Sequence, residues 1–231
     1  MKSVGLIGYG YWGKILLTKL KKLSDVKFIC TSRDDYISKL DLVEWVFVAT
    51  PNNTHYEIVR QCILNKKNVF CEKPLTLSYK ESVDLFILAK ENSVKLYVDD
   101  VFNYRTETTQ LHSQINKTSK IKVVSKSSFK NYLDDLFYHD IYLLYPILSG
   151  KLDINWPNIN NINFSYETTD EKIHFVDGVD FTHKADTNDA LFDMIKFVLQ
   201  DNVDYIYNKE VSLFSCKIIE EIKNASEEVS G

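Results

Sequence analysis

The segment 71–74 reads Cys-Glu-Lys-Pro and places two charged side chains directly after the apolar run 68–71. A charge at the end of a buried strand is costly unless it is paired or meets a ligand. Lys73 can stabilise negative charge on a substrate oxygen, and Glu72 can orient the lysine or contact a cofactor. We therefore take both as candidate site residues. Pro74 fixes the turn, and a cis peptide bond before it stays open beside the commoner trans state.

Asp135 and His139 form a second pair of candidate chemical groups. They stand four positions apart in the segment 135–148, and this segment has helical periodicity. Residues at this spacing project from one face of a helix. An acid beside an imidazole raises the pKa of the imidazole and orients the ring, which suits proton transfer near neutral pH. By themselves these residues also fit an ordinary pair on a helix surface, so both interpretations stay open.

A glycine pattern precedes these groups in the chain. Gly8, Gly10 and Gly13 form G-x-G-x-x-G between an apolar run and an amphipathic one. The first glycine permits a tight turn, the second lets the backbone approach a pyrophosphate, and the third lets the helix pack closely on the sheet. The spacing predicts a dinucleotide site, with turn glycines that bind nothing as the alternative. Three aromatic residues between the glycines belong to the same expected site: Tyr9, Tyr11 and Trp12.

The end of the second expected strand bears on the choice of dinucleotide. NAD calls for an acid there, which bonds the ribose 2'-hydroxyl. This chain instead has Ser32 and Arg33. A guanidinium can contact a 2'-phosphate with two N–H groups and stack on adenine. We favour NADP(H) over NAD(H), although the nearby Asp34 keeps NAD(H) open and Arg33 also fits an ordinary surface loop.

The elements that must position these groups follow from the first hundred residues. Runs that are apolar nearly throughout alternate with amphipathic stretches, which is typical of a parallel sheet covered on both faces. The sequence predicts an α/β fold that begins with a doubly wound Rossmann sheet. Ser78 and Glu81 form a capping-box sequence at the start of the third helix. We expect strands at 3–8, 26–31, 44–50, 68–73 and 95–100, and helices at 11–23, 54–67 and 78–93.

The remainder of the chain has a different order of elements. Strands gathered together and then followed by helices predict a reduced α+β unit with a mainly antiparallel sheet. We expect a dinucleotide-binding domain at 1–102 and a substrate-binding and oligomerisation domain at 103–231. Within the second domain we expect strands at 121–129, 161–168, 172–178 and 179–184, and helices at 135–148, 189–200 and 211–228.

The composition limits the classes of partner. A net charge of -4 and a pI near 5.8 give no basic field for a nucleic acid. The apolar stretches are shorter than the roughly 20 residues that cross a bilayer, and the N-terminus shows no export signal. We expect a cytoplasmic protein without a membrane span. The cysteines have no close pairing, which favours buried reduced thiols over a metal site or disulfides: Cys30, Cys62, Cys71 and Cys216.

Four motifs together resemble the glucose-fructose oxidoreductase / inositol dehydrogenase / MocA (Gfo/Idh/MocA) family of NAD(P)-dependent sugar oxidoreductases. They are, in chain order, GYGYWG (8–13), ATPNNTHYEIV (49–59), CEKPLTLS (71–78) and LDDLFYHDIYLL (133–144). Weaker similarity continues into the C-terminal helix, so the resemblance covers nearly the whole chain.

The resemblance implies roles for particular residues. Four of them would line the cofactor: Thr50, Pro51, Asn52 and His55. Lys73 would serve catalysis and binding, and His139 would be the general acid/base for a sugar hydroxyl. Asp135 would bind substrate or support the histidine.

The chain departs from the family pattern in its shortened second domain, which lacks the longer loop before the segment 133–144. The sugar pocket is then either more open or rebuilt by neighbouring side chains: Tyr104, Arg105, Phe137 and Tyr138. Arg105 could hold a phosphate, as in a nucleotide-sugar, or lie on the surface. The resemblance also implies a homodimer through the face of the second sheet.

These features predict an NAD(P)-dependent oxidoreductase that moves a hydride between nicotinamide and a sugar or nucleotide-sugar. One alternative is a dinucleotide-binding sensor or regulatory protein without turnover. Another is a reductase of a non-sugar carbonyl. The presence of Lys73, Asp135 and His139 together favours an enzyme, because a pure binder does not need them.

Overall fold

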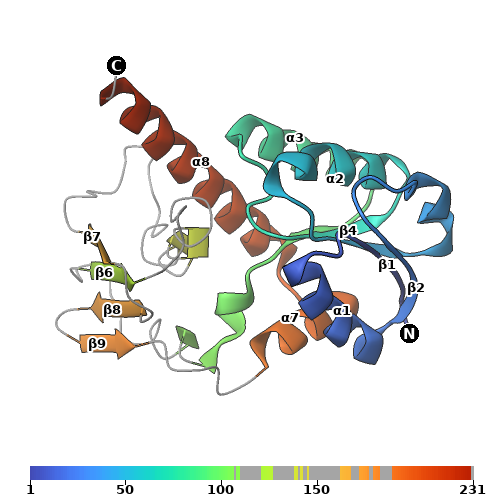
Figure 1. The fold of residues 1–231 in the computed structure, drawn as a ribbon, viewed down its shortest axis with the longest axis horizontal. Helices are drawn as coiled ribbons and strands as arrows, with labels where there is room; N and C mark the ends of the chain where they lie inside the picture. Colours follow the sequence, from blue (N-terminus) through green and yellow to red (C-terminus); the bar gives the residue numbers. More distant parts are fainter. Residues whose placement is uncertain are drawn as a thin grey trace. The chain divides into compact units, whose positions relative to one another are not determined.

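The computed structural model describes residues 1–106, 108–109, 121–126, 138–139, 141–142, 145, 162–167, 172–176, 179–182 and 189–229. The chain divides into two compact units. The first unit consists of Met1–Asp100 and Leu191–Gly231, and the second consists of Val101–Ala190. The elements of both are drawn in Figure 1, and each unit is described by itself.

Five parallel strands form the sheet of the first unit, in the order β2-β1-β3-β4-β5. They are β1 (Ser3–Ile7), β2 (Asp25–Cys30), β3 (Trp45–Val48), β4 (Asn68–Cys71) and β5 (Leu96–Val98). The order reverses between β1 and β3, and open sheets of this kind bind ligands at the carboxyl ends of the strands near such a reversal. The predicted Rossmann-type parallel sheet is confirmed.

Helices cover both faces of this sheet, as Figure 1 shows: α2 and α3 lie on one face, and α1 and α7 lie on the other. Because helices cover both faces of the sheet, β1, β3, β4 and the edge strand β5 are buried almost along their whole lengths, whereas residues of the other edge strand, β2, alternate between exposed and buried. The helices of the unit are α1 (Tyr11–Leu23), α2 (His55–Leu64), α3 (Tyr79–Glu91), α7 (Ala190–Leu199) and α8 (Tyr205–Val229). Short 3-10 segments are η1 (Ile37–Leu42), η2 (Asn52–Thr54) and, in the second unit, η3 (Val101–Tyr104).

An aromatic row runs across one face of the sheet. Phe47 stacks on Phe70 with 4.8 Å between ring centroids, and Phe70 stacks on Tyr97 at 6.1 Å. The opposite face carries smaller aliphatic side chains in the core formed with α2 and α3. Since side chains alternate along a strand, β3, β4 and β5 each supply both kinds of surface.

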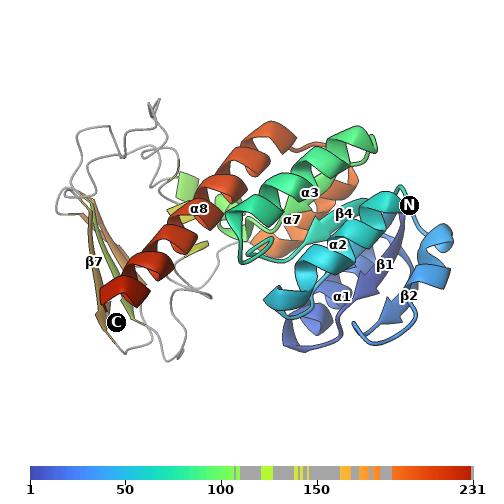
Figure 2. The same ribbon diagram turned by 90° about the horizontal axis from the view of Figure 1, so that it is seen from above.

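The end of the chain returns to the first unit, which differs from the expected domain 103–231. Tyr205 at the start of α8 lies edge-on to Tyr97, with 6.1 Å between centroids. The Asn208 side chain donates a hydrogen bond to the Val98 carbonyl at 2.8 Å and accepts one from the Val98 N–H at 2.9 Å. These bonds satisfy backbone groups on the outer side of the edge strand β5. Figure 2 shows α8 beside α3, which it contacts.

Two helix starts show how local side chains set the boundaries. α8 begins at Tyr205 rather than at residue 211, because an Asp204 carboxylate oxygen accepts hydrogen bonds from the N–H groups of Ile206 and Tyr207. α3 begins after Ser78 as predicted, but the expected capping hydrogen bond is absent. The Thr76 hydroxyl instead donates to the Ser78 carbonyl and accepts from the Ser78 N–H.

The second unit contains a four-stranded sheet in the order β7-β6-β8-β9. Its strands are β6 (Ile121–Lys126), β7 (Ile162–Glu167), β8 (Lys172–Val176) and β9 (Val179–Thr182). β8 pairs antiparallel with β6 and β9, whereas β6 and β7 are parallel. The sequence predicts a mainly antiparallel sheet; in the structure two of the three pairings are antiparallel, and β6 lies between β7 and β8.

The four cysteines are buried and free, as predicted. Burial raises the pKa of the Cys62 thiol to about 12, so this thiol is an inert part of the core. Among the described residues, no group of three or more His, Cys, Asp or Glu side chains could hold a metal ion. None of the helices in the described part of the chain is both long and apolar enough to span a bilayer.

Candidate functional site

The turn between β1 and α1 is closely packed at two of its glycines. Gly8 has a φ of +107°, and a Cβ there would lie 2.2 Å from the carbonyl oxygen of Ala49. A Cβ on Gly13 would lie 2.0 Å from the carbonyl oxygen of Gly8. The glycine turn therefore packs against the end of β3, and the start of α1 packs against the glycine turn. Neither Gly8 nor Gly13 leaves room for a side chain.

Gly10 is different, because a Cβ there would meet no atom within 4 Å. It is the N-cap of α1, and no side chain forms a capping hydrogen bond at this end of the helix. The first N–H groups of a helix lack partners within the helix and attract anions. The open side of Gly10 and this helix end fit the pyrophosphate of a dinucleotide.

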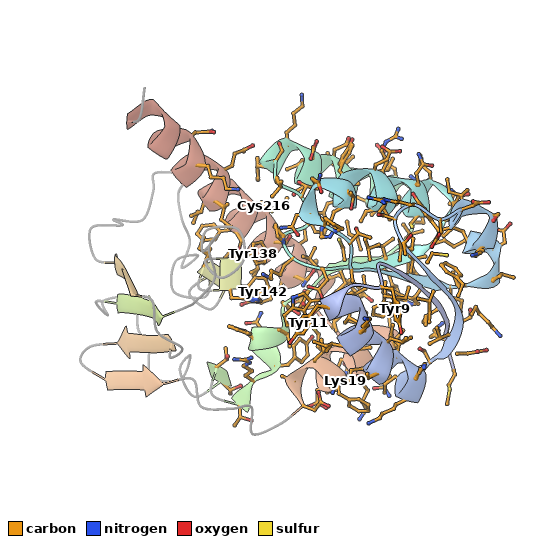
Figure 3. All side chains as sticks on the ribbon, in the orientation of Figure 1. Tyr9, Tyr11, Lys19, Tyr138, Tyr142 and Cys216 are labelled. Atoms are coloured by element: carbon orange, nitrogen blue, oxygen red, sulfur yellow. The ribbon has the colours of Figure 1, made fainter. Side chains whose placement is uncertain are left out.

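Aromatic side chains surround the same turn. Tyr9, Tyr11 and Trp12 are exposed by 46%, 76% and 53%, which is high for large rings. Tyr11 and Trp12 pack edge to face with 5.6 Å between centroids, and the Lys14 ammonium lies 5.5 Å from the centre of the Tyr9 ring. Figure 3 labels the two tyrosines at the start of α1. Exposed rings of this kind offer flat surfaces on which a ligand ring can stack.

The loop after β2 holds charges of both signs. A carboxylate oxygen of Asp34 accepts a hydrogen bond from the Thr31 N–H at 2.5 Å, and this bond is the main reason that the pKa of Asp34 is lowered. Ser32 is half-buried and Arg33 is exposed. The Lys39 ammonium donates to the Cys30 sulfur at 3.3 Å, at the last residue of β2. The spacing of residues along the chain does not single out Lys39, because only folding of the loop brings it back to the strand end.

The loop after β3 carries the next four predicted cofactor residues. Thr50 is buried and its hydroxyl accepts a hydrogen bond from the Thr54 hydroxyl at 2.8 Å. Pro51 is exposed and Asn52 is half-buried. Thr50 lies beside the glycine turn, since a Cβ on Gly8 would lie 2.9 Å from the Thr50 backbone nitrogen.

His55 is fully buried and does not reach the open side of this loop. Its Nδ1 lies 2.9 Å from the Pro74 carbonyl oxygen and its Nε2 lies 2.9 Å from that of Thr50. Burial lowers the pKa of the imidazole, against the opposing effect of the two carbonyls. The side chain therefore joins the loops that follow β3 and β4.

The ends of β4 and β5 form the charged part of the site. Glu72 and Asp99 are 6% and 5% exposed. They follow two paired strands, and the Asp99 N–H donates a hydrogen bond to the Cys71 carbonyl at 2.9 Å. Burial and then the charge of Asp99 raise the pKa of Glu72 well above its usual value, while Lys73 acts in the opposite direction. The Lys73–Pro74 peptide bond is cis, whereas trans was the commoner expectation. Asp99 was also missed, because a lone acid after a strand carries no motif.

In the second unit His139 stacks on Phe102, with 4.2 Å between ring centroids and 14° between ring planes. The Arg105 guanidinium carbon lies 3.9 Å from the centre of the same Phe102 ring. Tyr104 is half-buried and Tyr138 is buried. Figure 3 shows Tyr138 near Tyr142, at 5.8 Å between centroids.

Two predicted residues of this unit, Asp135 and Phe137, lie outside the described residues. Lys73 belongs to the first unit and His139 to the second. Their meeting at one site stays a prediction.

Comparison with protein families finds a match for residues 23–100, to the family described as "Oxidoreductase family, NAD-binding Rossmann fold" (Gfo/Idh/MocA). The chain is 33% identical over 122 residues to 2,7-anhydro-N-acetylneuraminate hydratase from Escherichia coli (strain K12), which covers 45% of this chain and 33% of the relative. It is 31% identical over 123 residues to myo-inositol 2-dehydrogenase from Thermotoga maritima, a match that covers 44% of this chain and 36% of the relative. The chain thus spans about a third of the length of these curated relatives.

Among solved structures, the WlbA (WbpB) dehydrogenase from Thermus thermophilus, in complex with NAD and UDP-GlcNAcA, is similar with a TM-score of 0.79. The match covers 96% of this chain and 94% of that chain at 14% identity. At this identity the comparison establishes a shared fold.

Proposed function

We propose that the protein is a nicotinamide-dependent oxidoreductase acting on a sugar or nucleotide-sugar, because residues 23–100 match the Gfo/Idh/MocA family of oxidoreductases, with its NAD-binding Rossmann fold. The observation that carries the proposal is the open side of Gly10 at the N-terminus of α1. It lies on the strand edge of the sheet that also carries Lys73 after β4.

We propose NADP(H) as the preferred cofactor. Three features after β2 support it: the Arg33 side chain is exposed, Lys39 adds a cation at the strand end, and the Asp34 carboxylate is already bonded to Thr31. A carboxylate held in this way is less suited to bond a ribose 2'-hydroxyl, while two cations favour a 2'-phosphate.

The bound nicotinamide supplies or accepts the hydride. The chain's own groups then place the substrate and manage charge at its oxygen. Lys73 stabilises a developing alkoxide, and His139, supported by Asp135, gives or takes the proton. Both assignments follow the family resemblance, and the stacking of His139 on Phe102 supports a fixed ring orientation.

A sugar-like substrate is supported by the relatives, since two of them are named for anhydro-N-acetylneuraminate and myo-inositol. The similar Thermus thermophilus dehydrogenase was solved with UDP-GlcNAcA. We propose that the second unit binds the substrate and that Arg105 contacts a phosphate of a nucleotide-sugar. A homodimer through the sheet β6–β9 is part of the proposal, and sedimentation of the purified protein tests it.

The first experiment measures binding of NADPH and NADH by nucleotide fluorescence, followed by turnover with a panel of keto-sugar nucleotides and simple sugars. Lys73→Ala should lower kcat by about 10² to 10⁴-fold while NADPH still binds. Lys80→Ala removes an exposed lysine of α3 and serves as the matched control. Failure of both nucleotides to bind would reject the dinucleotide site.

The same assays separate the alternatives. Binding without turnover of any carbonyl compound would favour a sensor. Turnover of non-sugar carbonyls alone would favour a reductase of non-sugar carbonyl compounds. A Lys73→Ala or His139→Ala variant as active as the wild type would contradict the roles proposed for these two residues.

A further inference from the structure

The Phe102 side chain contacts two of the residues that the proposed function assigns to the substrate. The His139 ring stacks on it with 4.2 Å between ring centroids and 14° between ring planes. The carbon of the Arg105 guanidinium lies 3.9 Å from the centre of the same ring. All three residues belong to the second unit, so both contacts lie within one compact part of the chain.

The two distances place the imidazole and the guanidinium on opposite faces of Phe102. Both groups are flat, and both lie at stacking distance from the ring centre. Each face of a phenyl ring has room for one flat group at that distance, so His139 covers one face and Arg105 covers the other. The faces of an aromatic ring are negative, and they attract the charged guanidinium.

The backbone of Phe102 is held in place as well. Its carbonyl oxygen accepts a hydrogen bond from the Thr108 hydroxyl at 2.5 Å and another from the Arg105 N–H at 3.2 Å. Phe102 lies in the 3-10 segment η3, and Thr108 is buried, so these bonds tie the segment to the interior of the unit. The ring therefore projects from an anchored backbone and can hold the two side chains that stack on it.

This way of holding a side chain suits a group that must act on a ligand. Phe102, Arg105 and His139 are each half-buried. Stacking engages one face of the imidazole and one face of the guanidinium, whereas the nitrogen atoms of both groups lie along their edges. The contact with Phe102 thus fixes an orientation without using the atoms that exchange protons or bind oxygen.

We propose that Phe102 is a positioning residue, which fixes the planes of His139 and Arg105 on its two faces and so keeps the proton-transfer group and the phosphate-binding group in one arrangement. A small misplacement of a catalytic group costs a large part of the rate, so restricting the imidazole contributes to turnover. The roles of His139 and Arg105 rest on the proposed function, whereas the stacked arrangement does not.

Proton NMR of the wild-type protein, without cofactor or substrate, tests the stacked arrangement. The ring current of Phe102 should shift the carbon-bound protons of the His139 ring upfield, and this shift should disappear in Phe102→Leu and persist in Phe102→Tyr. His139→Gln identifies the signals by removing them, and the signals of His55, in the first unit, serve as the unchanged reference. Absence of the upfield shift from the wild type would overturn the proposal, and this measurement needs no variant to fold.

Turnover of a keto-sugar nucleotide tests the positioning role. Phe102→Leu should lower kcat by about ten- to a hundredfold and raise the KM for the keto-sugar nucleotide about fivefold, with NADPH binding nearly unchanged. Phe102→Tyr should restore most of both losses, because it keeps the ring. Thr106→Ala alters an exposed neighbour and should behave as the wild type.

A double variant separates positioning from general support of the fold. In the His139→Gln background, Phe102→Leu should lower kcat no further, because the group that Phe102 positions is already gone. An equal fall of kcat in both backgrounds, or an unchanged kcat in Phe102→Leu, would overturn the positioning role and leave the proposed function standing. A wild-type protein without any turnover would reject the proposed function and the positioning role together, while the NMR experiment would still decide whether the rings stack.

Discussion

The glycine turn after β1 and the charged ends of β4 and β5 lie on the same edge of one sheet, yet backbone packing forms the first and buried side chains form the second. At the turn, Gly8 and Gly13 allow backbone to pack against backbone, and the open side of Gly10 receives no side chain. At the strand ends, the buried residues Glu72 and Asp99 follow two paired strands, and Lys73 is the next residue after Glu72. The turn depends on residues that have no side chain, whereas the strand ends depend on polar side chains that are buried away from water.

This difference determines how each region responds to change. The packed glycines of the turn cannot accept an added atom, because the neighbouring groups are backbone carbonyls that cannot move aside. The strand ends cannot lose a partner, because a buried polar group left alone carries its full desolvation cost.

The largest expected effect separates the glycines of the turn. Gly8→Ala and Gly13→Ala should each lower the free energy of unfolding by about 3 kcal/mol or more, since the new methyl group meets backbone. Gly10→Ala should fold with an unchanged Tm and bind NADPH at least about tenfold more weakly, since the methyl occupies space meant for phosphate. Thermal unfolding and nucleotide titration measure both; equal stability of all three variants would break the comparison.

At the other region, Asn208→Leu removes both hydrogen bonds to Val98, the last residue of β5 before Asp99. Two buried backbone groups lose their partners, so we expect a loss of about 2 to 4 kcal/mol in the free energy of unfolding. Chemical denaturation measures it, with Lys209→Ala as an exposed neighbouring control. A loss below about 0.5 kcal/mol would mean that α8 does not secure this edge.

The exposed charge near the turn should affect binding without affecting the fold. Arg33→Ala should weaken NADPH binding about tenfold, because one charge-assisted contact to the 2'-phosphate is lost. NADH binding should change little, and Lys39→Ala should show the same preference. Lys22→Ala, on the exposed side of α1, is the control. Equal losses for NADPH and NADH in Arg33→Ala would refute the 2'-phosphate contact.

The smallest expected effect is a change in how steeply the free energy of unfolding depends on pH. The pKa of Glu72 is raised in the folded protein above its usual 4.5, so the folded state holds a proton that the unfolded state releases. Its stabilising contribution is complete below pH 4.5 and declines as pH rises toward the folded pKa. Glu72→Gln should show a flatter dependence of unfolding free energy on pH across this window. Parallel curves for the two proteins would argue against a protonated Glu72.

The sequence alone determined the parallel sheet, its helices and the glycine turn, because these depend on local periodicity and on residue types that a backbone geometry requires. It also placed Glu72 and Lys73 at a strand end, since the apolar run before them has a clear limit. Local patterns gave His55 no role; the family resemblance implies that it lines the cofactor, which stays a prediction, and the fold buries it between the Pro74 and Thr50 carbonyls.

Only the tertiary structure decided which distant segments meet. It returned α8 to the edge of β5 through Asn208, set β6 between β7 and β8, and brought Asp99 beside Glu72 at two neighbouring strand ends. These outcomes depend on contacts between residues far apart in the chain and on the loss of water around them. The state of charge of a carboxyl group is set by that desolvation and by its neighbours in space, and neither is written in the spacing of residues along the chain.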